Sequence, residues 1–260
     1  MALRTQRRGL GWKDGEVDDR AEGADGVVDV KDVRQATLAL IRAGLDEDFV
    51  DGPDATATAT LDPNAPLEAA FVARDTGVVA GLEVIGWTMA EVNPVIAVEY
   101  TAADGDQVSP GTILAVVRGP ARDVVAAERT ALNLLTYASG IATKTGKWAD
   151  AIAGTGAQVR DTRKTLPGYR ALAKYAVRAG GGVNHRMSLG DAALIKDNHV
   201  AAVGSVVDAY LRVRETYPDL PVETEVDTLE QLREVLELHP ELVMLDNFTV
   251  EDTRAAVAMR

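Results

Sequence analysis

The sequence predicts an α/β protein in which a small sheet-containing domain precedes part of an α/β barrel. Two observations support this prediction. Between Leu67 and Gly119, stretches rich in Val and Ala alternate with Gly, Pro and Asp, which is typical of a small sheet with helical cover. After Gly156, short β-branched runs alternate with amphipathic helices. Such strand-helix repetition indicates a parallel sheet covered by helices, and the number of units favours an incomplete barrel.

The chain divides into three segments on the same grounds. Residues 1–30 mix both charge signs with Gly and show little apolar periodicity, so we expect a flexible arm. Residues 31–138 are predicted to form the first domain, which begins with a helix near Val33. Residues 139–260 are predicted to form the barrel domain.

A long helical stretch joins the two predicted domains. Apolar residues recur at helical spacing from Arg122 to about Ala153. Ser139-Gly140 lies within this stretch and predicts an interruption, because Gly weakens a helix. We therefore expect a pair of helices between the domains.

Composition excludes several classes of partner. The 260 residues carry a formal charge of -13, so nucleic acids and anionic membrane surfaces would be repelled at long range. There is no Cys, which excludes thiolate metal sites and disulfides. With only three His, a histidine-rich metal site is not expected either. The sequence shows neither a run of about 18 apolar residues nor a secretory signal. We expect a cytoplasmic protein.

Polar side chains follow each predicted barrel strand. The carboxyl ends of parallel barrel strands meet at one mouth, which is where active sites lie. The five apolar runs end in Arg163-Lys164-Thr165, near Asn184-His185-Arg186, and in Lys196, Glu225 and Asp246. A single charged residue after a strand is usually just a solvated group. Five such strand ends together predict a binding site, with His185 as its one histidine.

The segment of residues 160–197 reverses the charge balance of the chain. It holds eight Lys or Arg residues against three Asp residues. A concentrated positive site in an acidic protein focuses small anions. Arg forks match carboxylate and phosphate oxygens, while Lys supplies a compact charge. We therefore expect a multiply anionic small molecule to bind Arg163, Lys164, Arg186 and Lys196.

Two acids and a glycine run complete the candidate features. Glu225 and Asp246 could accept hydrogen bonds from sugar hydroxyls or hold Mg²⁺ beside a pyrophosphate, or they could be plain surface acids. The run of residues 180–182, Gly-Gly-Gly, lacks the Lys-Ser/Thr of a phosphate loop. It is interpreted as a tight turn before the next strand.

Four stretches of the sequence together resemble one enzyme family. They are ERTALNLLTYASGIATKT, DTRKTLPGYRALAKYAVRAGGGVNHRMSLGDAALIKDNHV, ETEVDTLEQL and VMLDNF. The order of DTRKT, GGGVNHR and IKDNH is far more specific than any single short motif. From about Val33 to its C-terminus, the chain resembles the quinolinate phosphoribosyltransferase family, also called carboxylating nicotinate-nucleotide pyrophosphorylase.

The resemblance implies an N-terminal α/β sandwich domain and a C-terminal α/β (TIM-like) barrel. It implies transfer of phosphoribosyl from phosphoribosyl pyrophosphate to quinolinate with loss of CO2, in NAD biosynthesis, with Mg²⁺ accompanying the pyrophosphate. The catalytic residues that it implies are Lys164, Lys196, Glu225 and Asp246. The substrate-binding residues are these four together with Arg129, Arg163, Thr165, His185 and Arg186.

Arg129 is the residue through which the resemblance implies a homo-oligomer. It lies in Glu128-Arg129-Thr130, which matches a family arginine that enters the site of the neighbouring subunit. Taken alone, this residue would be interpreted as part of an ion pair on a helix surface. A site that borrows an arginine is incomplete in a monomer, so the resemblance implies a homodimer or a higher homo-oligomer.

The chain also departs from the family pattern. Family barrels continue with further strand-helix units beyond the position at which this chain stops, so we expect an incomplete barrel with an apolar edge that needs cover. One alternative is an incomplete, non-catalytic homologue that binds a small dicarboxylate. Another is a related pyridine or molybdenum-associated phosphoribosyltransferase that uses a different acceptor.

Overall fold

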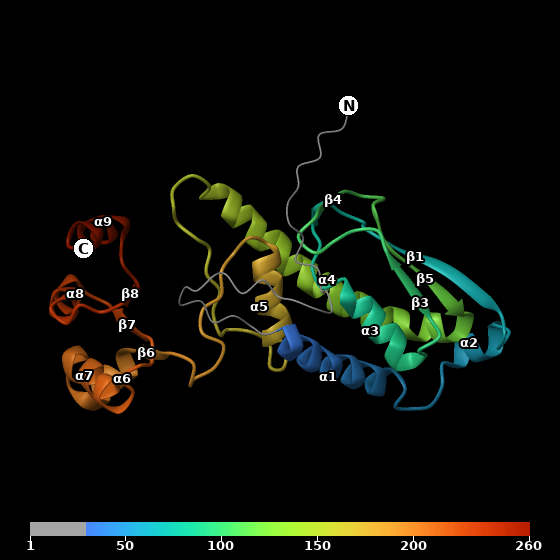
Figure 1. The fold of residues 1–260 in the computed structure, drawn as a ribbon, viewed down its shortest axis with the longest axis horizontal. Coiled ribbons are helices and arrows are strands. Elements are labelled where there is room, and N and C mark those ends of the chain that lie inside the picture. Colours follow the sequence, from blue (N-terminus) through green and yellow to red (C-terminus); the bar gives the residue numbers. More distant parts are fainter. Residues whose placement is uncertain (1–29) are drawn as a thin grey trace. The chain divides into compact units, whose positions relative to one another are not determined.

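A computed structural model describes residues 30–260 as two compact units, which divide between His185 and Arg186 (Figure 1). The flexible arm predicted for residues 1–30 lies outside the described residues, apart from Val30, which begins the first helix. The domain bounds of 31–138 and 139–260 stay a prediction.

The first unit contains a small antiparallel sheet. Its strands β1 (Pro66–Val72), β5 (Ile113–Pro120) and β3 (Ala97–Tyr100) lie in the order β1-β5-β3, and β2 (Gly77–Val78) pairs with β4 (Gln107–Val108). Alternate residues of β5 face the core, where Ala115 and Val117 are fully buried. They pack in one cluster with Ile85 and Leu135 from the helices. The small sheet with helical cover is confirmed.

Five helices accompany this sheet in the described part of the first unit. They are α1 (Val30–Asp48), α2 (Ala55–Thr60), α3 (Glu83–Val92), α4 (Ala121–Ala151) and α5 (Arg170–Ala179). Helix α1 packs against α3, α4 and α5. Across the described range, no helix is both long enough and apolar enough to cross a bilayer.

Helix α4 is continuous, so the predicted interruption at Ser139-Gly140 is wrong. Tertiary contacts on both sides of this dipeptide hold the helix, because Ala138 and Ala142 are fully buried. The Ser139 hydroxyl accepts a hydrogen bond from the Ala80 backbone N–H at 3.1 Å. Packing of the apolar face outweighs the weak helix propensity of one exposed Gly.

A buried carboxylate links two helices of the first unit. Asp104 accepts hydrogen bonds from the backbone N–H groups of Gly81 and Leu82, at 2.9 and 3.0 Å, at the start of α3. The Tyr175 hydroxyl of α5 donates to the same carboxylate at 2.5 Å. Burial raises the pKa of Asp104, and the three donors act against that shift because they favour the charged form. Asp104 therefore fixes α3 relative to α5.

The second unit is a parallel sheet with helical connections. Strands β6 (Ala193–Ile195), β7 (Val222–Val226) and β8 (Leu242–Leu245) lie side by side in that order. Helices α6 (Asp197–Val203) and α7 (Val206–Thr216) connect β6 to β7, α8 (Leu229–Leu236) connects β7 to β8, and α9 (Val250–Ala258) follows β8. Ser205, Thr228 and Thr249 cap α7, α8 and α9 through their side-chain oxygens. Three of the five predicted barrel strands thus form a sheet.

The first two predicted barrel strands are reduced to one parallel bridge in the first unit. Arg160 pairs with Val183, and the Asp161 backbone N–H donates to the Val183 carbonyl at 3.2 Å. The chain reaches this bridge through residues 180–182, where a side chain on Gly180 or Gly182 would meet neighbouring atoms at less than 3 Å. The tight turn predicted for the glycine run is confirmed.

Two glycine substitutions test this packing. Gly180→Ala is expected to lower the free energy of unfolding by about 1–3 kcal/mol, because its Cβ would lie 2.4 Å from the Ala142 carbonyl oxygen. Gly140→Ala, in open space on α4, is expected to raise it by about 0.5–1 kcal/mol. Urea unfolding followed by circular dichroism measures both. Equal stability of the two variants would contradict the packing at Gly180.

Candidate active site

The predicted site residues belong to two groups, one in each compact unit. The first unit holds Arg129, Arg163, Lys164, Thr165 and His185. The second unit holds Arg186, Lys196, Glu225 and Asp246. Within each group, main-chain and side-chain contacts determine how the functional atoms are held.

In the first unit, Asp161 begins a basic loop (residues 161–165) and connects it to His185, at the end of the next predicted strand. One oxygen of its carboxylate accepts the His185 backbone N–H at 2.8 Å, and the other accepts the Asn184 side-chain amide at 2.6 Å. The Lys174 ammonium forms an ion pair with the same carboxylate and donates to the His185 carbonyl at 2.6 Å. The structure therefore joins Asp161, which directly precedes Thr162-Arg163, to the His185 main chain. Asn184 belongs to a predicted strand end, whereas Lys174 is not among the residues predicted for the site.

The basic loop keeps polar atoms that have no partner in the described structure. The Nε atom of Arg163 and the hydroxyl of Thr165 are buried without a hydrogen bond. Lys164 is exposed, and its backbone N–H donates to the Thr162 hydroxyl at 3.0 Å. Leaving buried polar atoms unpaired costs free energy, so Arg163 and Thr165 are suited to a polar ligand.

A cavity adjoins this loop. It has a volume of about 540 Å³ and is lined by Lys164 and Thr165 together with Tyr137 and Pro167. A small ligand that entered it would meet the exposed Lys164, the unpartnered Thr165 hydroxyl and an apolar wall. The ion-paired Asp161 and Lys174 also line the cavity. This combination of an apolar body and few polar contacts is typical of small-molecule sites.

Fewer of the basic residues in the segment 160–197 are available to bind a ligand than the sequence suggests. Lys174, counted among the eight basic residues of 160–197, is 1% exposed and paired with Asp161. Arg178 is half-buried beside Tyr175, and burial lowers its pKa. The concentrated positive charge predicted for this segment is therefore smaller than its composition indicates.

In the second unit, Lys196 and Glu225 form an ion pair between neighbouring strand ends. Lys196 follows β6, Glu225 lies near the end of β7, and their Nζ and Oε2 atoms are 3.1 Å apart. The Glu225 side chain is 9% exposed and that of Lys196 is 42% exposed, so the ammonium keeps access to solvent. The His199 Nδ1 atom accepts the Lys196 backbone N–H at 3.0 Å and fixes the start of α6.

Asp246 follows the third strand of the same sheet. Its backbone N–H donates to the Val226 carbonyl at 3.0 Å, and its carboxylate accepts the Asn247 side-chain amide at 2.8 Å. Asn247 has a φ of 57°, a left-handed conformation that Asn tolerates better than most residues. Asp246 and Glu225 therefore end two adjacent parallel strands, β8 and β7.

Arg186 begins the second unit and is half-buried. Its guanidinium donates to the Ala192 carbonyl at 2.8 Å, across its own loop. This contact orders the segment that leads into β6. A role for Arg186 toward a substrate stays a prediction.

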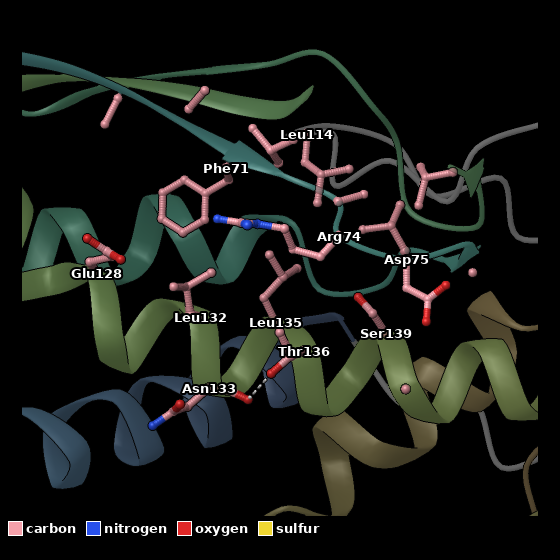
Figure 2. A pocket seen from close by; sticks show the side chains of 18 of the residues that line it. Phe71, Arg74, Asp75, Leu114, Glu128, Leu132, Asn133, Leu135, Thr136 and Ser139 are labelled. Atoms are coloured by element: carbon pink, nitrogen blue, oxygen red, sulfur yellow. Dashed lines mark hydrogen bonds between the residues drawn. The ribbon is translucent and has the colours of Figure 1, made fainter. Parts of the chain in front are cut away.

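Arg129 lies apart from the basic loop, on the exposed side of α4. It lines a separate cavity of about 610 Å³, whose walls come from β1, β5 and α4. Figure 2 shows Phe71, Leu114 and Leu132 facing this cavity, with the Arg74 side chain reaching toward Phe71. No residue after Thr143 lines it, so it is not the predicted anion site.

The fold belongs to the α/β class, and the basic and acidic residues near its strand ends have the chemistry of a site for a small anion. Comparison with known proteins specifies the family. The family model for the N-terminal domain of quinolinate phosphoribosyl transferase matches residues 54–139, and the model for its C-terminal domain matches residues 141–260. The chain belongs to the quinolinate phosphoribosyltransferase family, a family of decarboxylating pentosyltransferases.

Similar proteins agree with this assignment. A nicotinate-nucleotide pyrophosphorylase (carboxylating) of Mycobacterium leprae is 53% identical over 227 residues, which cover 86% of this chain and 80% of that protein. A quinolinate phosphoribosyltransferase (decarboxylating) of Nicotiana glauca, named as mitochondrial, is 40% identical over 85% of this chain and 64% of its own length. The chain thus spans just under two thirds of that plant relative.

Solved structures confirm the predicted fold class. NadC from Streptococcus pyogenes aligns with a TM-score of 0.81 at 35% identity, over 85% of this chain and 78% of its own. The nicotinate-nucleotide pyrophosphorylase from Francisella tularensis aligns with a TM-score of 0.81 at 33% identity, over 86% and 79%. The α/β class with an N-terminal sheet domain and a barrel-like C-terminal domain is therefore correct, and so is the resemblance found in the sequence.

Proposed function

We propose that this chain transfers the phosphoribosyl group of phosphoribosyl pyrophosphate to quinolinate, with decarboxylation, in de novo NAD biosynthesis. The products are nicotinate mononucleotide, pyrophosphate and CO2. Family membership supports the reaction. The observation that supports these residues is the pair of buried, unpartnered atoms on Arg163 and Thr165, in the loop that Asp161 fixes to His185.

In this proposal, the basic residues bind the two carboxylates of quinolinate. Quinolinate carries two adjacent carboxylates, which suit the Arg163 fork and the Thr165 hydroxyl. The exposed Lys164 ammonium adds a compact charge that can also contact phosphate. His185 and Arg186 complete the set implied by the family resemblance.

In this proposal, phosphoribosyl pyrophosphate binds at the parallel sheet of the second unit. The Lys196 ammonium can contact both a quinolinate carboxylate and a neighbouring phosphate, while Glu225 and Asp246 accept hydrogen bonds from ribose hydroxyls or hold Mg²⁺. Among the described residues, no three His or acidic side chains cluster in a way that could hold a metal ion. In this proposal an Mg²⁺ ion would therefore have at most two protein ligands, Glu225 and Asp246 on adjacent strands, and pyrophosphate oxygens and water would supply the rest. When bound, Mg²⁺ neutralises charge on the leaving pyrophosphate.

The residues act mainly by positioning and electrostatics. As the C1–pyrophosphate bond breaks, the ribosyl centre becomes cationic, and the pyridine nitrogen of quinolinate attacks it. The cationic ring nitrogen then stabilises the electron pair left at C2 when that carboxylate departs as CO2, and C2 takes up a proton from water to give nicotinate mononucleotide. No covalent bond to the protein is needed. Fixed cations hold the substrate for both steps.

Arg129 supports a homodimer. Its exposure on α4 leaves its guanidinium accessible to a second subunit, as the family resemblance implies. We include a cytoplasmic homodimer in the proposal, in which each Arg129 serves the partner's site.

The turnover assay tests the proposed reaction directly. Quinolinate, phosphoribosyl pyrophosphate and Mg²⁺ are expected to yield nicotinate mononucleotide, and chelation of Mg²⁺ by EDTA is expected to abolish its formation. Liquid chromatography measures the product. Quinolinate binding without any product would favour the non-catalytic homologue. Product formation only with another pyridine acceptor would favour the related transferase.

Substitution of two basic residues tests the assigned roles. Arg163→Ala and Lys196→Ala are each expected to weaken quinolinate binding by about 10–100-fold, because each removes a charge-assisted hydrogen bond. Calorimetric titration measures the affinity, and the melting temperature should stay near that of the parent protein. Lys147→Ala, on the exposed side of α4, is the matched control. An unchanged affinity would remove either residue from the site.

Complementation tests whether Arg129 acts in the partner's site. Arg129→Ala and Lys164→Ala are each expected to be inactive. Refolding an equal mixture is expected to restore about one quarter of the parent activity, because each mixed dimer regains one intact site. If Arg129 acts within its own subunit, every site in the mixture carries one defect and no activity returns.

A further inference from the structure

A lysine is fully buried beneath the basic loop. Lys174 lies on α5, and its immediate neighbours Ala173, Tyr175 and Ala176 are at most 5% exposed. Its side chain is 1% exposed, and that of its partner Asp161 is 7% exposed. The pair therefore lies within the protein.

A buried ion pair of this kind is weak evidence for stability. The loss of hydration when two charges are buried offsets much of their mutual attraction. Replacing a buried ion pair by apolar residues is therefore often neutral or stabilising. Lys174 instead makes contacts of high geometric specificity. Its ammonium binds the Asp161 side chain and the His185 main-chain carbonyl, which lie 24 residues apart along the chain.

The two partners of Lys174 also bind each other. The His185 backbone N–H donates to the Asp161 carboxylate at 2.8 Å, so Lys174, Asp161 and the His185 main chain form a closed ring of contacts. Asn184 closes a second ring, because its side-chain amide donates to Asp161 at 2.6 Å and to the Lys174 carbonyl at 2.9 Å. Asp161 directly precedes Thr162-Arg163, so these rings set where the Arg163 loop leaves the bridge between Arg160 and Val183.

We propose that Lys174 is a positioning residue of the quinolinate site. Through Asp161 and the His185 carbonyl, its buried ammonium sets the spacing between the Arg163 loop and His185. This inference rests on the proposed function. Lys174 and Asp161 line the cavity beside the loop, and the inference gives Lys174 a role through its two partners and not as a substrate ligand. A displacement of about 1 Å in such a site can cost roughly 100-fold in rate. Lys174 therefore governs the quinolinate half of the reaction and leaves the ribosyl-pyrophosphate half, assigned to the second unit, unaffected.

Two variants, called the link variants, remove the ion pair between Lys174 and Asp161 in different ways. Lys174→Met keeps the length of the side chain and leaves Asp161 without its cation. The double variant D161N/K174M removes both charges, so that no unpaired charge is buried. Tyr175→Phe, on the same helix, is the matched control: it removes a buried hydrogen bond to Asp104, which is not part of the site.

Steady-state kinetics give the first readout. In both link variants, the KM for quinolinate is expected to rise at least about tenfold, while the KM for phosphoribosyl pyrophosphate changes less than about twofold. Tyr175→Phe is expected to lower the melting temperature and to leave both KM values unchanged. Equal changes in the two KM values, or unchanged KM values in a folded link variant, would overturn the proposal. Failure of both link variants to fold would show a purely structural pair and would also overturn it.

Amide hydrogen exchange gives a readout that needs no substrate. The His185 N–H and the amides of residues 161–165 are expected to exchange at least about tenfold faster in the link variants, and not in Tyr175→Phe. If the parent protein forms no product, the proposed function fails while this measurement still decides the positioning. Unchanged exchange in folded link variants would sink the inference alone.

Discussion

The Asp161 carboxylate is the constraint on which the first half of the site depends. It accepts two hydrogen bonds and one ion pair, from residues on α5 and on the strand end at 184–185. A buried carboxylate is tolerated only when its partners are all in place, so α5, the basic loop and His185 must order together. The tight turn at residues 180–182 makes this possible, because it returns the chain from α5 to the bridge at Val183 with no room for a side chain at Gly180 or Gly182.

Much of the fold could be predicted from local patterns. The runs that became β6, β7 and β8 were identified by their apolar residues, and Ser205, Thr228 and Thr249 stand where the helices after them begin. Helix α4 could not be predicted in full. Its continuity through Gly140 depends on burial of one face against residues more than 50 positions earlier, and local propensity carries no information about that contact.

The candidate site shows the same limit for charge. The sequence correctly places basic residues after predicted strands, but it cannot separate a cation that serves a ligand from one neutralised inside the protein. Lys164 is exposed beside a cavity, whereas Lys174 is buried against Asp161. The only signal in the sequence is the position of Lys174 within the short helix RALAKYAVRA, among small and apolar residues. Alternation of polar and apolar residues in a ten-residue helix leaves that position ambiguous.

Local neutralisation also explains how an acidic chain can hold an anionic substrate. With a formal charge of -13, the protein repels anions at long range, but at physiological salt that field is screened beyond about 8 Å. Binding must therefore come from a few cations at contact distance. Arg163 keeps a buried, unpartnered Nε atom, and Lys196 is held by Glu225 while 42% of its side chain stays exposed. An arriving anion can share Lys196 with Glu225 without displacing it, because an ammonium has three donors. In the proposed site, Glu225 therefore orients Lys196 before the anion binds.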